Sequence, residues 1–171
     1  MERELETAEC YHRRFLIVYT RVFGFHALHF CQSIIMSNPI PMQLARIIKS
    51  DISENQVIYL KEIEGDRQFP ILIGYFEATS IDLRVTNAER PARPLTHDLI
   101  VGVAQSLGAK IECVVITELK DQTYYALLRL QRDGESIDVD ARPSDAIAVA
   151  VSFQPHLPIL VESEILERFT Q

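Results

Sequence analysis

The sequence DARPSDAIAVA, residues 140–150, decides how the second half of this chain folds. An arginine and a proline lead through a hydroxyl residue into a carboxylate and then an apolar stretch, which is typical of a capped helix start. The same order of residue types stands at residues 93–98, as Arg-Pro-Leu-Thr-His-Asp. Each run therefore places an arginine beside backbone N–H groups that attract anions.

Strand-like segments surround these runs in an order that occurs twice. Three such segments precede a helix start in each half: 43–49, 56–62 and 69–73 before Tyr75, and 111–118, 123–131 and 135–140 before Ser144. Gly stands beside Asp in the turn that joins the last two strands of each half, which favours tight hairpins. The pattern predicts an α+β fold of duplicated β3-α repeats, forming intertwined mixed or antiparallel sheets with packed helices.

Three further segments complete this plan, and one stretch of the second repeat needs interpretation. A helix is predicted over 96–107, with Leu99, Ile100, Val103, Ala104 and Leu107 on one face. Residues 146–153 alternate as a strand would, but their alanines favour a helix that is buried on every side. A short strand over 158–161 and a helix from Ser163 end the chain.

Composition limits the classes of function that this chain can have. Its 171 residues, 47% of them hydrophobic, are enough for one domain with a proper core. The formal net charge is −7, and the first 41 residues contribute none of it, because they hold four basic and four acidic residues. An acidic body is a poor match for nucleic acid. A phosphate substrate would therefore need a local basic patch or a bound divalent metal.

Residues 1–41 differ in character from the rest and end in the Pro-containing stretch 37–41. We expect an N-terminal extension here and a working domain over 42–171. Two alternatives stay open for the extension: a disordered appendage, or an artefact of a start codon assigned too early. Residues 15–36 are apolar, but Arg21 and two histidines interrupt them, so no membrane association is expected. Three dispersed cysteines favour a reduced, cytoplasmic protein.

Three blocks of the sequence resemble the signature blocks of the bifunctional nuclease domain family. They are FPILIGYFEA at 69–78, RPLTHDL at 93–99 and DARPSDAIAVA at 140–150. The resemblance extends from about Met42 to Glu164, with the blocks in the family's order and spacing. It implies an α+β fold built from intertwined repeats. It also implies a nuclease activity toward DNA and RNA, as in some plant members.

Phosphodiester hydrolysis often uses divalent metals held by carboxylates, so we considered which acidic residues could be ligands. Glu77 and Asp145 each stand in the first turn of a predicted helix. Asp138 and Asp140 share one face of a strand, and Asp140 is adjacent to the second arginine run. We expect Glu77, Asp140 and Asp145 to be ligands of Mg²⁺ or Mn²⁺, and we expect no organic cofactor. The alternative is that carboxylates at a helix start only complement the helix dipole.

Histidine and arginine complete the predicted site. His97, with Asp98 and Asp145 as further catalytic residues, could act as a general base, a metal ligand or an acid for the leaving group. Arg93 and Arg142 are predicted to bind phosphate. The alternatives are that the His97 ring only fixes its loop, and that the arginines pair internally with aspartates and tie the repeats together.

Two functions follow as hypotheses. The first is a nuclease of low sequence specificity that acts on DNA, RNA or both, assisted by a metal. The second is a regulatory or adaptor domain without catalysis, whose strand edges pair with a protein partner or with another copy in a homo-oligomer. A nuclease site should place His97 and at least two carboxylates in one open cleft. An interlock between repeats should bury the arginines in ion pairs.

Overall fold

The computed structural model describes residues 39–50, 52–86 and 91–169. The described residues all belong to one compact unit, Ser37–Gln171. Its elements are, in chain order, β1 (Ile40–Ile48), β2 (Asn55–Glu62), β3 (Gln68–Gly74), α2 (Tyr75–Val85), α3 (Thr96–Ser106), β4 (Lys110–Lys120), β5 (Thr123–Arg132), β6 (Glu135–Ala141), α4 (Pro143–Ala150), β7 (Ile159–Val161) and α5 (Ser163–Glu167). Each predicted strand and helix is therefore present, within a few residues of its expected bounds.

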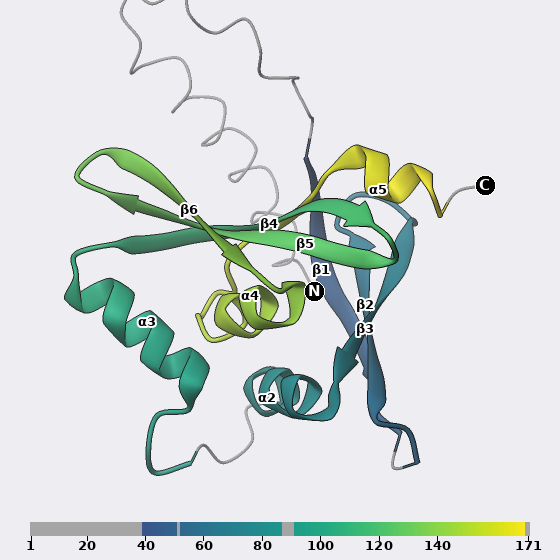
Figure 1. Ribbon diagram of the computed structural model, residues 1–171, viewed down its shortest axis with the longest axis horizontal. Coiled ribbons are helices and arrows are strands. Elements are labelled where there is room, and N and C mark those ends of the chain that lie inside the picture. Colours follow the sequence, from purple (N-terminus) through teal and green to yellow (C-terminus); the bar gives the residue numbers. More distant parts are fainter. Residues whose placement is uncertain (1–38, 51, 87–90, 170–171) are drawn as a thin grey trace, which may run out of the picture. The chain divides into compact units, whose positions relative to one another are not determined.

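The strands in the described part of the chain form one mixed sheet in the order β3-β2-β1-β7-β4-β5-β6 (Figure 1). The short strand β7 joins the two halves of this sheet. It pairs antiparallel with β1, where Ile40 faces Val161, and parallel with β4, where Val114 faces Ile159. All other neighbouring strands are antiparallel. The predicted α+β class is thus confirmed.

The order of three strands and a helix occurs twice, as β1-β2-β3-α2 and as β4-β5-β6-α4. Each trio of strands is contiguous in the sheet, so the strands of the two halves do not alternate with one another. The tight hairpin predicted between β5 and β6 is present: Asp133 and Gly134 both have positive φ, of 52° and 85°, as a two-residue hairpin turn requires. That the two halves are duplicated copies of one unit stays a prediction.

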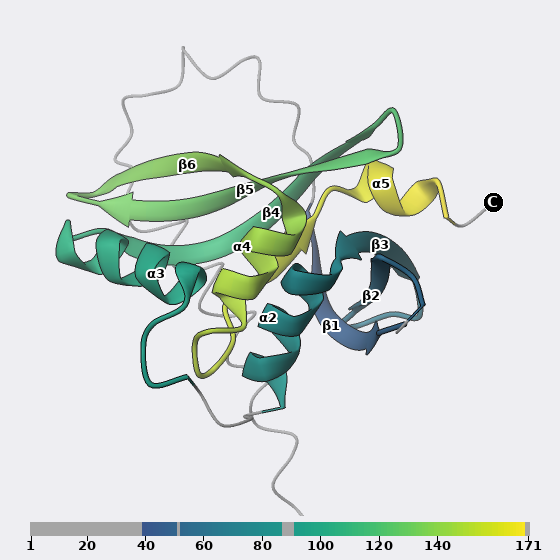
Figure 2. The same ribbon diagram turned by 60° about the horizontal axis from the view of Figure 1, so that its bottom comes forward.

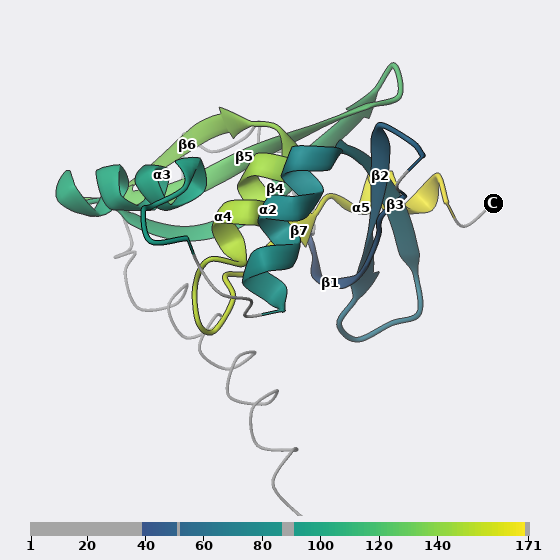
Figure 3. The same cartoon turned by 90° about the horizontal axis from the view of Figure 1, so that it is seen from below.

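Helices α2, α3 and α4 lie on the same face of the sheet, and α2 runs beside α4 (Figures 2 and 3). The five residues Ala146–Ala150 of α4 are each at most 1% exposed. A helix that is apolar on every side suits this central place between sheet and neighbouring helices. The helical interpretation is therefore confirmed for residues 146–150, whereas residues 151–153 form a turn after the helix.

The two Arg-Pro runs do begin helices, but their hydroxyl residues are not the caps. The N-cap of α3 is Leu95 and that of α4 is Arg142, so Thr96 and Ser144 lie inside the first turn. The third helical residue is acidic in α2, α3 and α4: Glu77, Asp98 and Asp145. These carboxylates, and not the hydroxyls, are the side chains that face the positive ends of the helix dipoles.

The expected domain boundary at Met42 and the expected N-terminal extension can be compared with the structure only in part. Strand β1 begins at Ile40, before the expected boundary at Met42, and Met42 is buried in the core. The predicted extension covers residues 1–41, and its residues 1–38, with the apolar stretch 15–36, lie outside the described residues. None of the helices in the described part of the chain has the length and apolar character needed to cross a bilayer.

Candidate active site

The first turns of α2 and α4 are joined by an arginine shared between two carboxylates. Arg142 donates from Nε to Asp145 Oδ2 at 2.8 Å and from Nη2 to Asp145 Oδ1 at 3.1 Å. Its Nη2 also lies 3.0 Å from Glu77 Oε1. A Cβ on Gly74 would stand 2.3 Å from Glu77 Oε2, so the Glu77 side chain passes closely over the start of α2. The absence of a side chain at residue 74 makes room for this carboxylate.

His97, from the first turn of α3, contacts both of the other helices. Its Nε2 lies 3.3 Å from Asp145 Oδ1 in α4, and its Nδ1 lies 2.9 Å from Ser80 Oγ in α2. The His97 side chain is 12% exposed, whereas the Arg142 side chain is 66% exposed. The cluster therefore has a sheltered histidine at one end and an accessible guanidinium at the other.

Behind His97 lies a buried arginine. Arg84, which is 4% exposed, donates from Nη1 to Ser80 Oγ and to the Ser80 carbonyl, both at 2.7 Å. Its Nε donates to Ser152 Oγ at 2.7 Å, and its Nη2 donates to Asp98 Oδ1 at 2.9 Å. The guanidinium of Arg84 thus ties α2 to α3 and to the segment that follows α4.

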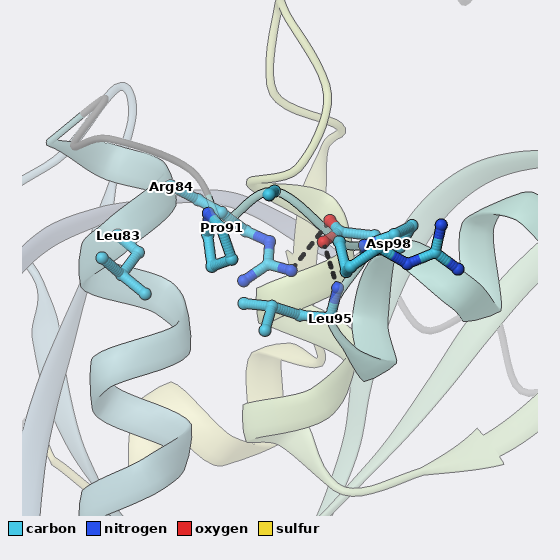
Figure 4. A pocket seen from close by; sticks show the side chains of 8 residues that line it. Leu83, Arg84, Pro91, Leu95 and Asp98 are labelled. Atoms are coloured by element: carbon cyan, nitrogen blue, oxygen red, sulfur yellow. Dashed lines mark hydrogen bonds and ion pairs between the residues drawn. The ribbon is translucent and has the colours of Figure 1, made fainter.

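Asp98 is the residue that connects this buried arginine to the loop before α3. Its Oδ2 accepts a hydrogen bond from the Leu95 backbone N–H at 2.9 Å, while its Oδ1 binds Arg84 (Figure 4). Both residues line a pocket of about 320 Å³, together with Leu95 and Arg93. The ordinary role of an acidic third helical residue, capping its own helix, is fulfilled here by Asp98.

The charges of the cluster stabilise one another. Burial raises the pKa of the Asp145 carboxyl, but hydrogen bonds from Arg142 and His97 outweigh it, so the pKa lies below its ordinary value. The hydrogen bond to Asp145, with a smaller effect of Glu77, raises the pKa of the Arg142 guanidinium. Asp145 is therefore ionised at neutral pH, and its carboxylate can accept a hydrogen bond from a proton-bearing nitrogen of His97.

The structure brings together four of the predicted site residues: Glu77, His97, Arg142 and Asp145. Asp98 lies one residue from His97 but turns to Arg84. The other two predicted residues, Arg93 and Asp140, lie elsewhere.

Arg93 is exposed at the pocket before α3 and forms no ion pair with a described residue. Asp140 is exposed on β6, opposite Leu127 of β5. Across the described ranges, no three or more His, Cys, Asp or Glu side chains are grouped closely enough to hold a metal ion. Glu77 and Asp145 instead share the guanidinium of Arg142. The predicted ligands Glu77, Asp140 and Asp145 thus do not form one cluster in this structure.

Sequence reasoning missed Arg84 and Ser80. A signal for Arg84 was present, since the buried residues of α2 are Ala78, Ile81 and Arg84, spaced three apart. This spacing places Arg84 on the same helix face as the apolar residues, where a charged side chain needs buried partners. Ser80, four residues before Arg84, lies next to it on the helix surface and is one of those partners.

The family model of the bifunctional nuclease domain matches residues 58–171, which is more than half of the chain and includes the whole cluster. The chain therefore belongs to the bifunctional nuclease domain family. An uncharacterized protein of Mycobacterium tuberculosis is 42% identical over 120 residues, which cover 70% of each chain. Bifunctional nuclease 1 of Oryza sativa subsp. japonica is 29% identical over 135 residues, 77% of this chain and 38% of the rice protein. Bifunctional nuclease 1 of Arabidopsis thaliana is 29% identical over 105 residues, 59% of this chain and 32% of its own.

Proposed function

We propose that this chain is a nuclease that hydrolyses phosphodiester bonds in DNA, RNA or both, with low sequence specificity. The observation that carries the proposal is the meeting of His97 and two carboxylates with the exposed guanidinium of Arg142. The plant relatives, which are named bifunctional nucleases, support the same reaction class. A cytoplasmic location is part of this proposal.

Arg142 would bind the phosphate, because a guanidinium fork matches two phosphoryl oxygens. Its two carboxylate partners hold that fork in place while leaving two thirds of the side chain exposed. A phosphate that draws Arg142 toward itself leaves more of the Asp145 charge to His97. That charge favours transfer of a proton from an attacking water to Nδ1 of the ring, with the water taking the place of the Ser80 hydroxyl that bonds this nitrogen in the free chain.

A requirement for Mg²⁺ or Mn²⁺ stays a prediction, and no organic cofactor is proposed. A divalent ion would supply charge stabilisation at the phosphoryl oxygens, and Glu77 and Asp145 are the carboxylates closest to the proposed phosphate position. The proton transfer proposed for His97 does not depend on such an ion. Addition of EDTA therefore tests the metal separately from the residues.

The proposal is tested by cleavage of fluorescent single-stranded DNA and RNA by the full chain, with Mg²⁺, with Mn²⁺ and with EDTA. His97→Ala and Asp145→Ala are prepared in the same way, and Thr79→Ala on α2 is the control. Among the described residues, the Thr79 hydroxyl bonds only the Tyr75 carbonyl of its own helix. Cleavage that is lost in the first two variants and kept in the third supports the nuclease. Cleavage that survives both site variants indicates a contaminant and contradicts the proposal.

A regulatory or adaptor domain is the second proposed function, and a specific surface favours it. Leu99 and Val103 of α3 and its C-cap residue Leu107 are exposed, and of the apolar face predicted for this helix only Ala104 is buried. An exposed stripe of this kind is typical of protein interaction sites. Analytical ultracentrifugation of the full chain and of Leu99→Asp/Val103→Asp tests one such partner, a second copy. Self-association in the unchanged chain alone would support a homo-oligomer, and a monomer at all concentrations would contradict it.

A further inference from the structure

We infer that Arg84 and Ser80 are positioning residues that hold His97 as the tautomer with its proton on Nε2, facing Asp145. The catalytic meaning of this inference rests on the proposed nuclease function. The hydrogen bonds that hold the His97 ring are independent of that function.

The direction of each hydrogen bond follows from the donors. Arg84 has only donors, so Ser80 Oγ must accept from Arg84 Nη1, at 2.7 Å. The hydroxyl proton of Ser80 is then free to be donated to His97 Nδ1, at 2.9 Å. A neutral ring that accepts at Nδ1 carries its proton on Nε2. That proton lies toward Asp145 Oδ1, at 3.3 Å, where a carboxylate accepts it.

Arg84 can impose this order because its own position is fixed on every side. Ser152 Oγ accepts from Arg84 Nε at 2.7 Å and donates to the Ala148 carbonyl at 2.7 Å. Asp98 Oδ1 and the Ser80 carbonyl accept from the two remaining nitrogens. A buried guanidinium with all three nitrogens bonded loses much energy if it turns, since each donor would be left unsatisfied.

Two arms therefore act on the His97 ring, one at each nitrogen. Asp145 accepts at Nε2, and the Arg84–Ser80 arm donates at Nδ1. A general base needs the ring held in one tautomer and one orientation, as the carboxylate partner of a catalytic histidine does in other hydrolases. Removing Asp145 isolates the contribution of the Arg84–Ser80 arm.

The test is a long-range nitrogen–proton correlation spectrum of the histidine rings of the full chain, recorded above neutral pH. His97→Ala identifies the His97 signals among those of the five histidines. In Asp145→Ala we expect His97 to keep the Nε2–H tautomer alone, with a hydrogen-bonded Nδ1. In Asp145→Ala/Arg84→Lys we expect a measurable fraction of the Nδ1–H tautomer. Lysine keeps the charge of residue 84 and removes the fork.

The matched control is Asp145→Ala/Arg129→Lys. Arg129 also binds an aspartate, with two bonds to Asp138 at 2.7 Å each, but both of these side chains are more than a third exposed. The variant Asp145→Ala/Arg129→Lys should show the same His97 tautomer as Asp145→Ala alone. If Asp145→Ala alone already gives two tautomers, in the same ratio as with Arg84→Lys, the inference is wrong.

Ser80→Ala in the unchanged chain gives a second reading that does not require the double variants to fold. We expect the nitrogen frequency of His97 Nδ1 to move toward that of a nitrogen without a hydrogen bond, whereas Thr79→Ala leaves it in place. An unmoved frequency in Ser80→Ala contradicts the inference. Kinetics add a separate readout: Arg84→Lys should lower kcat by about 10-fold with KM unchanged. Absence of any cleavage would contradict the nuclease proposal and leave the spectra to decide the positioning role.

Discussion

The two Arg-Pro runs share one pattern of residue types but form different interactions in the folded chain. In the run that begins α4, Arg142 pairs with Asp145 in its own first turn and reaches across to Glu77. In the run that begins α3, Arg93 is exposed and forms no ion pair with a described residue, and Asp98 binds the buried Arg84. The first run forms the candidate active site, and the second forms an interlock between helices.

Spacing accounts for the difference. Asp145 stands three positions after Arg142, so the guanidinium of the N-cap residue can reach the third helical residue. Asp98 stands five positions after Arg93, because this arginine lies two residues before the N-cap Leu95. The two hypotheses for the arginines, phosphate binding and internal pairing, are thus divided between different parts of the molecule. Similar motifs in one chain need not share a role.

The largest difference between the two runs should appear in catalysis, when the acidic residue of each run, Asp145 or Asp98, is replaced. We expect Asp145→Asn to lower kcat/KM by about 100-fold to 10,000-fold, because the carboxylate that orients and stabilises the His97 ring is lost. Asp98→Asn keeps the size of the side chain at the interlock and should lower kcat/KM by less than about 10-fold. Cleavage rates measured on folded proteins of equal circular dichroism provide the comparison. Equal losses in the two variants would show that the runs do not differ in role.

The interlock around Arg84 should contribute more to stability than an exposed ion pair does. Arg84→Ala removes a buried cation and leaves Ser80 and Ser152 without a donor, so we expect the free energy of unfolding to fall by about 2 kcal/mol or more. Arg129→Ala, at the exposed pair with Asp138, should cost less than about 1 kcal/mol. Urea denaturation at neutral pH measures both. A loss at residue 129 as large as that at residue 84 would contradict the interlock.

The elements of the fold could be predicted from the sequence because their signals are local. Strand alternation, the Asp-Gly turn at 133–134 and the helix starts each depend on neighbours within a few residues. The N-cap positions were less predictable. A hydroxyl residue after proline resembles a cap, but Arg142 takes that place because proline suits the first helical position.

The site was predictable only in part, because its contacts join residues far apart in the chain. Family blocks indicated Glu77, His97, Arg142 and Asp145, but nothing in their spacing showed that one guanidinium would serve both carboxylates. Asp140, two residues before Arg142 in sequence, is exposed on β6 and forms no ion pair with a described residue. Such pairings depend on how three helices pack, and local patterns do not contain that information.

Lowering the pH should weaken the ion pair between Asp145 and Arg142 at the start of α4. Because the pKa of Asp145 is lowered in the folded chain, the carboxylate contributes stability above the pKa of an unfolded aspartate. This contribution is lost as the pH falls through the folded value. We expect the stability advantage of the unchanged chain over Asp145→Asn to shrink by about 1 kcal/mol between pH 6 and pH 3. Urea denaturation at the two pH values measures this change, with Asp140→Asn as the control. A constant difference would contradict the ion pair.

The smallest expected effect concerns Arg93, and it tests how far the first comparison extends to substrate binding. Arg93 can contact a phosphate without giving up an ion pair with any described residue, whereas Arg142 must share its guanidinium with Glu77 and Asp145. An exposed arginine contributes through long-range attraction, so we expect Arg93→Ala to raise KM by about 3-fold, leave kcat unchanged and flatten the dependence of KM on salt. Arg142→Ala should lower kcat as well, because its charge acts on the reacting phosphate. Cleavage assays at two or more salt concentrations distinguish these results. A fall in kcat for Arg93→Ala would place this residue at the reacting phosphate and bring the two runs back to one shared role.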